Sequence, residues 1–489
     1  MSLTLYNTLT RTQQLFQPLE PGPVRIYCCG VTVYDYCHLG HARSYIVWDT
    51  LRRYLMASGY QVRYVQNFTD IDDKILNRAR QEGSSMEAVA EKFTESYFED
   101  MARLNILPAD EYPRATHTLD GIQRLIHELE QKGYAYAAAG DVYYQVQDFP
   151  DYGKLSGRKL SEMQAGASGR VDDDPDAPKK KYVFDFALWK AAKPGEPYWS
   201  SPWGNGRPGW HIECSAMVRD CLGETIDIHC GGADLVFPHH ENEIAQSEAV
   251  TGKPLANYWL HNGMVTVGGE KMSKSLGNFT TIRDLLGRPT DPMAVRLFVL
   301  TAQYRKPIDF TPEAISAAEN GWQTLKEGLL FGYQYGEQLG WQPLEPISDL
   351  TTIAEEPHIQ KFQGAMDDDL NTPAGLAVLF ELAKELRRER NRLVHAGTTD
   401  SNSETLAHNW QILLTLAEIL GLAVSADEIT VAPTTEGLSD ADIEALIAQR
   451  QAARQGKNFA EADRIRKELQ QQGITLIDQG GGVTRWHRN

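Results

Sequence analysis

The pattern of apolar and polar positions near the start of the chain predicts a buried strand followed by a helix. Residues 24–30 are mostly apolar over a strand-like length, and residues 41–58 carry apolar side chains at helical spacing. The helical positions are Tyr45, Ile46, Trp48, Leu51 and Leu55. His38 and His41 therefore fall at a strand-to-helix turn, where a doubly wound α/β sheet binds nucleotides.

A second, longer apolar pattern occupies the later part of the chain. From Pro312 to about Val424 the apolar positions repeat at helical spacing and predict a helical bundle. The repeat is clearest at Leu376, Leu379, Phe380, Leu382 and Leu386. Residues 426–440 are rich in Thr, Ser and Pro and predict a linker, after which we expect a small helical module.

The composition is that of a soluble protein with several domains. The chain has 489 residues, of which 42% are hydrophobic, and it contains no run of eighteen apolar residues that would predict a membrane span. It has six cysteines. Because no signal peptide is recognisable, we expect reduced thiols and a cytoplasmic location rather than a disulfide framework.

Two short motifs place candidate phosphate-binding side chains far apart in the sequence. The first is His38-Leu39-Gly40-His41, and the second is the segment Lys271-Met272-Ser273-Lys274-Ser275, which has glycines on both sides. A flexible loop that closes over a triphosphate would explain why the two lysines are flanked by glycines. The alternative interpretations are two polar residues at a helix start and a solvated basic turn.

Together the two motifs resemble the HIGH and KMSKS motifs of class I aminoacyl-tRNA synthetases, with Leu39 in place of the usual isoleucine. The resemblance implies an ATP-dependent adenylating enzyme with an α/β, Rossmann-like catalytic domain. The resemblance implies that the reacting phosphates of ATP are stabilised by His38, His41, Lys271 and Lys274, and that Mg²⁺ accompanies the ATP. Gly40 would allow the adenine or the phosphates to approach the backbone closely.

A third constellation indicates a metal site. Cys214 ends the segment Gly-Trp-His-Ile-Glu-Cys, and His239 and Glu243 lie four residues apart in Phe-Pro-His-His-Glu-Asn-Glu, where Pro238 is well placed to begin a helix. On one helix face these two side chains can hold one metal ion, and Cys29 and Cys214 would complete a tetrahedral zinc site. The alternative is a set of buried thiols beside ordinary polar residues.

These segments resemble the zinc site of cysteinyl-tRNA synthetases, which implies Cys29, Cys214, His239 and Glu243 as ligands. The doubled cysteine makes the first ligand ambiguous, because strand alternation points Cys28 and Cys29 to opposite faces; Cys29 is favoured because it directly precedes Gly30. The resemblance further implies that Asp234 meets the ribose of ATP and that Thr69 and Trp210 line the amino-acid pocket. Helix capping for Asp234 and core packing for Trp210 remain open.

The resemblance implies a cysteine–tRNA ligase. Its substrates would be ATP, L-cysteine and tRNA(Cys), and one Zn²⁺ per chain would bind the substrate thiolate and exclude serine without editing. We expect a monomer. Two alternatives stay open: a ligase that joins cysteine to a glucosaminyl-inositol acceptor in the mycothiol pathway, and a non-catalytic, zinc-stabilised RNA-binding protein.

The expected domains follow the resemblance and the loop chemistry. The Rossmann-like catalytic domain takes residues 1–112 and 200–254, with a connective insertion at 113–199. A connecting domain with the KMSKS loop takes 255–311, the helical bundle 312–425, and an anticodon-binding module 426–489.

Charge complicates the assignment of a tRNA partner. Subtracting 66 acidic from 48 basic residues gives −18, whereas phosphate binding favours a basic surface. The terminal module nevertheless concentrates basic residues at Arg450, Arg454, Lys457, Arg464, Arg466, Lys467, Arg485 and Arg488. A solvated helix of mixed charge is an equal alternative, and Trp486 fits either base stacking or a core position.

Overall fold

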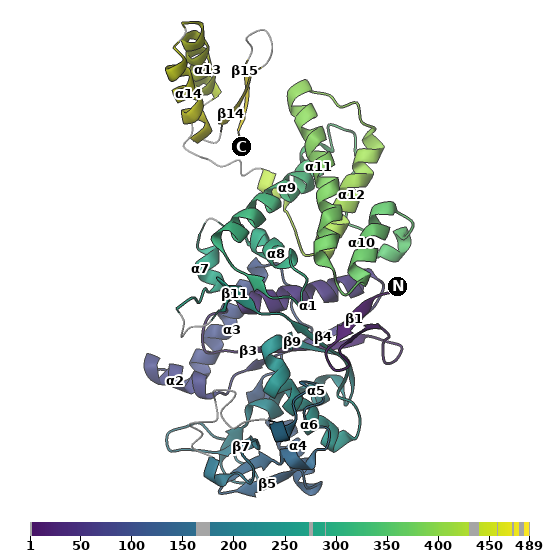
Figure 1. Cartoon of the computed structure of the whole chain (residues 1–489), viewed down its shortest axis with the longest axis vertical. Helices are drawn as coiled ribbons and strands as arrows, with labels where there is room; N and C mark the ends of the chain where they lie inside the picture. Colours follow the sequence, from purple (N-terminus) through teal and green to yellow (C-terminus); the bar gives the residue numbers. More distant parts are fainter. Residues whose placement is uncertain are drawn as a thin grey trace. The chain divides into compact units, whose positions relative to one another are not determined.

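The computed structural model describes residues 2–162, 177–272, 277–288, 290–429, 440–456, 458–471, 474–478 and 484–488. The chain forms two compact units, Met1–Val424 and Ser425–Asn489. Figure 1 shows the course of both.

The first unit is built on a parallel sheet in the order β10-β9-β3-β4. Its strands are β3 (Val24–Thr32), β4 (Val62–Thr69), β9 (Ile226–Gly232) and β10 (Ala256–Asn262). Helix α1 (Leu39–Ala57) packs on one side of this sheet, and α5 (Trp210–Leu222) with α6 (Glu241–Thr251) on the other (Figure 1). The chain order reverses between β3 and β9, so the carboxyl ends of these strands form a ligand-binding crevice. The Rossmann-like α/β prediction is confirmed.

Between β4 and α5 the chain forms a separate antiparallel sheet in the order β5-β6-β7-β8. Its strands are β5 (Ala135–Ala138), β6 (Asp141–Tyr144), β7 (Phe186–Ala191) and β8 (Gly206–Pro208). Helices α2 (Asp73–Glu82), α3 (Met86–Arg103) and α4 (Leu119–Gln131) precede it. The sheet extends to Pro208, past the expected end of the insertion at residue 199.

After β10 a three-stranded sheet carries the second motif. Its order is β12-β11-β13, with β11 (Val265–Val267), β12 (Glu270–Lys271) and β13 (Ile308–Asp309). Helices α7 (Ile282–Leu286) and α8 (Pro292–Leu300) lie between β12 and β13 in the chain. At the N-terminus β1 (Thr4–Asn7) and β2 (Thr12–Leu15) form a hairpin whose β1 packs against β10.

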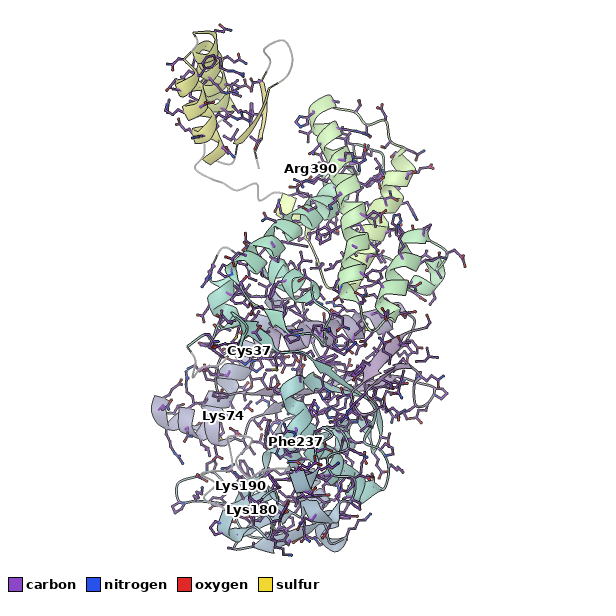
Figure 2. All side chains as sticks on the ribbon, viewed as in Figure 1. Cys37, Lys74, Lys180, Lys190, Phe237 and Arg390 are labelled. Carbon is purple, nitrogen blue, oxygen red and sulfur yellow. The ribbon has the colours of Figure 1, made fainter. Side chains whose placement is uncertain are left out.

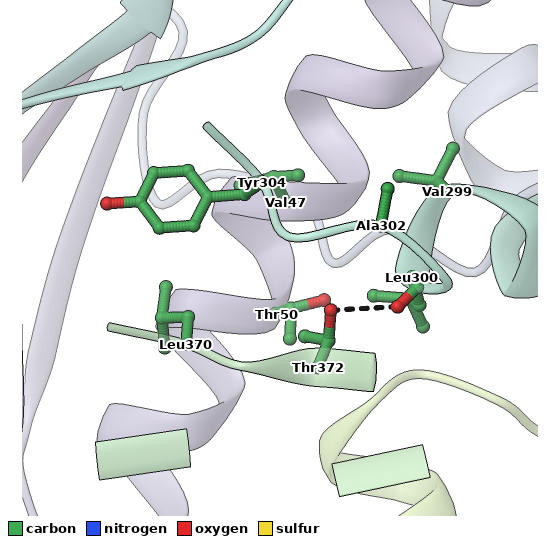
Figure 3. Close-up of a pocket in the computed structure, with 8 residues that line it drawn as sticks. All are labelled: Val47, Thr50, Val299, Leu300, Ala302, Tyr304, Leu370 and Thr372. Atoms are coloured by element: carbon green, nitrogen blue, oxygen red, sulfur yellow. Dashed lines mark hydrogen bonds between the residues drawn. The ribbon is translucent and has the colours of Figure 1, made fainter. Parts of the chain in front are cut away.

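Four long helices follow, as the apolar periodicity predicts: α9 (Pro312–Tyr335), α10 (Pro357–Asp367), α11 (Thr372–Ala396) and α12 (Ser403–Ile419). The start of α11 packs against α1 and α8 around a small apolar cavity (Figure 3). There the Thr372 hydroxyl donates to the Leu300 carbonyl at 2.8 Å. This contact ties the start of α11 to the end of α8, which itself packs on α1.

The second unit is not purely helical, which corrects the expectation from sequence. Helices α13 (Asp440–Gln455) and α14 (Phe459–Gln471) pack with an antiparallel hairpin of β14 (Ile474–Asp478) and β15 (Thr484–Arg488). The indole of Trp486 packs on the apolar core of this unit and donates to Glu444 at 2.7 Å. Arg464 pairs with Glu461 and Glu468, as a solvated helix of mixed charge predicts.

Among the described residues, no helix is both long enough and apolar enough to cross a membrane.

Candidate active site and metal centre

The four expected metal ligands come together at the carboxyl ends of β3 and β9. Cys29 lies on β3, Cys214 on α5 and Glu243 on α6, while His239 lies on the π-helical turn η6 (Val236–His240). The ligand atoms of all four are within 4.8 Å of one another and the side chains are buried. The expected helix start at Pro238 agrees with the structure: Phe237 is extended, and the helical backbone that follows it runs through the end of η6 into α6, with the His239 and Glu243 side chains on one face.

The spacings within this group match those of a tetrahedral site. The Cys29 and Cys214 sulfurs are 4.0 Å apart, the Cys29 sulfur lies 3.5 Å from Glu243 Oε1, and His239 Nε2 lies 3.1 Å from the same oxygen. Zinc bonds of about 2.3 Å to sulfur and about 2.1 Å to oxygen or nitrogen give tetrahedral edges of roughly 3.8, 3.6 and 3.4 Å. The group is therefore close to the shape that a metal requires. Cys28 is not part of it.

Sequence reasoning missed a layer of histidines behind these ligands. His229 Nε2 lies 2.8 Å from Glu243 Oε2, His211 Nδ1 lies 2.9 Å from His239 Nδ1, and His240 bonds His261 at 2.8 Å. Partners of this kind orient metal ligands and tune their basicity. The only cue in the sequence was a high density of histidine near Cys214 and Cys230, which does not show the contacts.

Two of these histidines create a second candidate group, because Cys29, His229, His240 and Glu243 also lie within 4.8 Å of one another. One of its distances is that of a hydrogen bond, however: His229 Nε2 lies 2.8 Å from Glu243 Oε2. A metal shared by these two atoms needs roughly 3.4 Å between them. The geometry favours the first group.

The electrostatics of the group favour one thiolate and one carboxylate. A hydrogen bond from Cys29 lowers the pKa of Cys214 to about 6, whereas burial raises that of Cys29. Burial alone would raise the pKa of Glu243, but His229 and His239 hold it well below its ordinary value. An anionic, soft donor set of this kind suits zinc.

Of the two residues expected in the amino-acid pocket, Trp210 contacts this group directly, and Thr69 contacts Glu213, the residue before Cys214. The half-buried Trp210 ring packs on His239, with ring centroids 4.3 Å apart. Thr69, at the end of β4, donates its hydroxyl to the buried Glu213 carboxylate at 3.0 Å. Asp234 is exposed just after β9, at the same edge of the sheet, and the structure does not place it at a helix cap.

His38 and His41 cap helix α1 reciprocally. The His38 ring accepts from the His41 backbone N–H, and the His41 ring accepts from the His38 backbone N–H. The two rings stack at 3.7 Å. A side chain at Gly40 would meet the His38 ring at 2.8 Å, which explains the glycine. Both residues are half-buried, and their geometry is compatible with the helix-start interpretation and with a role in binding phosphate. Cys37, labelled in Figure 2, marks the position.

The chain that follows the lysine motif is bonded to this helix start. The Lys271 backbone lies on β12, whereas Lys274 lies outside the described residues. Beyond the loop, Leu39 N–H donates to the Thr280 carbonyl at 3.2 Å, and Ile282 N–H donates to the Cys37 carbonyl at 2.9 Å. The far end of the KMSKS loop is therefore fixed directly to the residues around His38.

The sheet, crevice and paired motifs define the catalytic domain of a class I tRNA synthetase. A family model for the tRNA synthetases class I (C) catalytic domain matches residues 15–320, a DALR domain model matches 361–424, and a cysteinyl-tRNA ligase anticodon binding domain model matches 436–485. The chain belongs to the cysteine–tRNA ligase family.

Individual relatives agree with this assignment. The chain is 69% identical to the cysteine–tRNA ligase of Trichodesmium erythraeum and 68% identical to that of Gloeothece citriformis, each match covering all of both chains. Among solved structures, a Mycobacterium tuberculosis methionyl-tRNA synthetase in complex with methionyl-adenylate superposes with a TM-score of 0.56 at 16% identity. That match covers 82% of this chain and 89% of the other, and it supports the fold.

Proposed function

We propose that the protein activates L-cysteine with ATP and transfers it to tRNA(Cys). The cysteine carboxylate attacks the α-phosphorus of ATP, which forms cysteinyl adenylate and releases pyrophosphate. The hydroxyl of the terminal tRNA adenosine then attacks the acyl carbon and releases AMP. The observation that carries the proposal is the buried group of two thiols, one imidazole and one carboxylate at the carboxyl edge of a nucleotide-binding sheet.

Cys29, Cys214, His239 and Glu243 fit zinc by donor type and by spacing, and we assign them as its ligands. Zinc bound there supplies selection of the substrate thiolate over a serine hydroxyl. The protein's own residues fix that selection: His229 holds Glu243, His211 holds His239, and the Trp210 ring closes over the imidazole. Thr69 lines the adjoining pocket.

The ATP site lies at the start of α1. His38 and His41 meet the phosphates with their imidazoles, and Lys271 and Lys274 supply positive charge when the loop closes, since phosphoryl transfer depends on stabilising charge in the transition state. Mg²⁺ accompanies the ATP. Asp234, exposed after β9, faces the ribose from the next strand. No side chain acts as a covalent nucleophile.

The second unit binds the anticodon end of the tRNA. Its support is the match of residues 436–485 to an anticodon binding domain model. We propose that the chain acts as a cytoplasmic monomer, as the family resemblance implies.

Cysteine-dependent ATP–pyrophosphate exchange, followed by charging of a tRNA(Cys) transcript, tests the proposal. We expect exchange with cysteine and little exchange with serine, followed by cysteinyl-tRNA formation. Exchange without tRNA charging, together with cysteine transfer to a glucosaminyl-inositol, would establish the mycothiol-type alternative. RNA binding without any exchange would establish the non-catalytic one.

A further inference from the structure

Arg43, two residues after His41, is a buried cation whose hydrogen bonds within the described residues all go to backbone carbonyls. Its side chain is 1% exposed and donates to the carbonyls of Met264 at 2.7 Å, of Tyr304 at 3.1 Å and of Lys306. Burial lowers its pKa to about 10. In the part of the chain that the structure describes, no carboxylate forms an ion pair with it. Three carbonyl dipoles therefore take the place of a counterion. Burying a cation in this way costs free energy, and a role in positioning the site would explain why this residue is an arginine.

The three carbonyls all belong to the segments that begin the KMSKS sheet. Met264 directly precedes β11, and Lys306 lies just before β13. The two segments are bonded to each other as well, since Gly263 N–H donates to the Tyr304 carbonyl at 2.8 Å and Ile308 N–H donates to the Met264 carbonyl at 3.1 Å. A side chain at Gly263 would overlap the Lys306 carbonyl oxygen at 2.5 Å, so the crossing requires glycine.

From this crossing the sheet leads directly to the lysine. Thr266 pairs with Lys271 across β11 and β12. The Asp309 carboxylate accepts from the Thr266 hydroxyl at 2.7 Å and from the Gly269 N–H at 3.0 Å, and so holds the turn of the hairpin. A displacement at Arg43 therefore reaches Lys271 through a short and fully bonded path.

The same segment is held from its other side. Asp369, which is 1% exposed and precedes α11, accepts from the Tyr304 hydroxyl at 2.8 Å and from Arg305 Nε at 2.6 Å. Figure 3 shows Tyr304 beside Val47 of α1. Residues 304–306 are thus bonded to Asp369 on one side and to Arg43 on the other. The β11–β12 hairpin is thereby fixed to α1.

We propose that Arg43 is a positioning residue for adenylate formation, which fixes the KMSKS hairpin relative to the imidazoles at the start of α1. The proposal rests on the proposed phosphate role of Lys271. If His38 and His41 meet one side of the triphosphate and Lys271 the other, their separation must be held to a fraction of an ångström, because a displacement of about 1 Å can cost about 10²-fold in rate.

The test compares Arg43→Lys with Arg52→Lys. Arg52 is a matched control on the same helix: it is 8% exposed and donates to the Pro108 carbonyl at 2.5 Å and to Asp110. Among the residues that the structure describes, its Nε has no hydrogen-bond partner, as in Arg43. In cysteine-dependent pyrophosphate exchange, kcat of Arg43→Lys should fall by about 10- to 100-fold with KM for cysteine within twofold. Arg52→Lys should keep kcat at a similar thermal unfolding midpoint.

Combining Arg43→Lys with Lys271→Ala separates the two claims. If Arg43 acts through the hairpin, the double variant should be little slower than Lys271→Ala alone, because one interaction cannot be lost twice. Additive losses, or equal losses in Arg43→Lys and Arg52→Lys, overturn the positioning role while leaving the lysine role intact. An unaffected Lys271→Ala variant overturns the lysine role itself.

If Arg43→Lys does not fold, Asp309→Ala carries the test, because Asp309 is exposed and holds only the hairpin turn. We expect a lower kcat with an unchanged KM for cysteine. Wild-type kcat in Asp309→Ala would overturn the proposed path from Arg43 to Lys271.

Discussion

Cys214→Ser should strip the protein of zinc, whereas Cys28→Ser should leave about one equivalent bound. The reason is geometric: the Cys214 sulfur lies 4.0 Å from that of Cys29 within the four-ligand group. Cys28 points to the opposite side of β3 and pairs in register with Cys230 on β9. The two variants remove one thiol each from buried positions, so they differ only in whether that thiol belongs to the metal group.

The size of the loss follows from the number of ligands. A four-ligand zinc site contributes about 10–16 kcal/mol of apparent binding free energy, so one ligand in four contributes roughly 2.5–4 kcal/mol, or about 10²- to 10³-fold in affinity. His229 supports Glu243 from outside the group, and removing such a partner costs about 10- to 100-fold. From the tightest to the weakest zinc binding, the expected order of the variants is therefore Cys28→Ser, His229→Ala and Cys214→Ser.

The assay is zinc content after purification, followed by competition with a chelator of known affinity. Each variant should also be checked by thermal unfolding with excess zinc, since a buried substitution can act through folding. If Cys214→Ser retains its metal while His229→Ala loses it entirely, the ion occupies the second group, with His229 and His240 as ligands. A wild type that is fully active without metal would refute the site.

Three further outcomes are expected. Lys274→Ala should lower kcat for pyrophosphate exchange by about 10²- to 10³-fold with little change in KM for cysteine, and unaltered kinetics would refute the phosphate role. Truncation after Val424 should preserve exchange, weaken tRNA charging and flatten its salt dependence, whereas undiminished charging would show that the second unit does not bind the anticodon. Burial raises the pKa of Asp100 to about 6 despite the nearby Arg283. The free energy of unfolding of the wild type should therefore fall relative to that of Asp100→Asn as the pH rises from about 4 to 6. A difference between their unfolding midpoints that does not change with pH would contradict this.

Local patterns in the sequence were sufficient for the core of the catalytic domain. The apolar run at residues 24–30 and the helical spacing that follows correspond to β3 and α1, because period and burial are properties of neighbouring residues. The assignment of four metal ligands came from short motifs, and the structure brings these four side chains together. Their occupation by zinc stays a prediction.

What sequence reasoning missed depends on contacts between distant segments. His229 and Arg43 look like ordinary polar residues within apolar elements, and only the fold brings His229 on β9 to Glu243 on α6 and Arg43 on α1 to Met264 before β11. The terminal hairpin was missed for another reason. The alternation in Thr484-Arg485-Trp486-His487-Arg488 is typical of a strand, but these residues were considered only as part of the basic cluster of the module, with tRNA binding and a solvated helix of mixed charge as equal alternatives.

The two halves of the site meet different physical demands, and the structure supports them differently. Discrimination of a thiol from a hydroxyl requires a rigid donor set, and Cys29, Cys214 and Glu243 lie on a strand and two helices with a second layer of hydrogen bonds behind them. The proposed phosphate role places Lys271 and Lys274 on one loop, so their position relative to ATP depends on where the ends of that loop are fixed. One end is bonded to Cys37 and Leu39, and the other reaches α1 through the carbonyls that Arg43 binds. Both ends are therefore fixed to α1, the helix that begins with the two imidazoles, as the proposed phosphate role of the lysines requires.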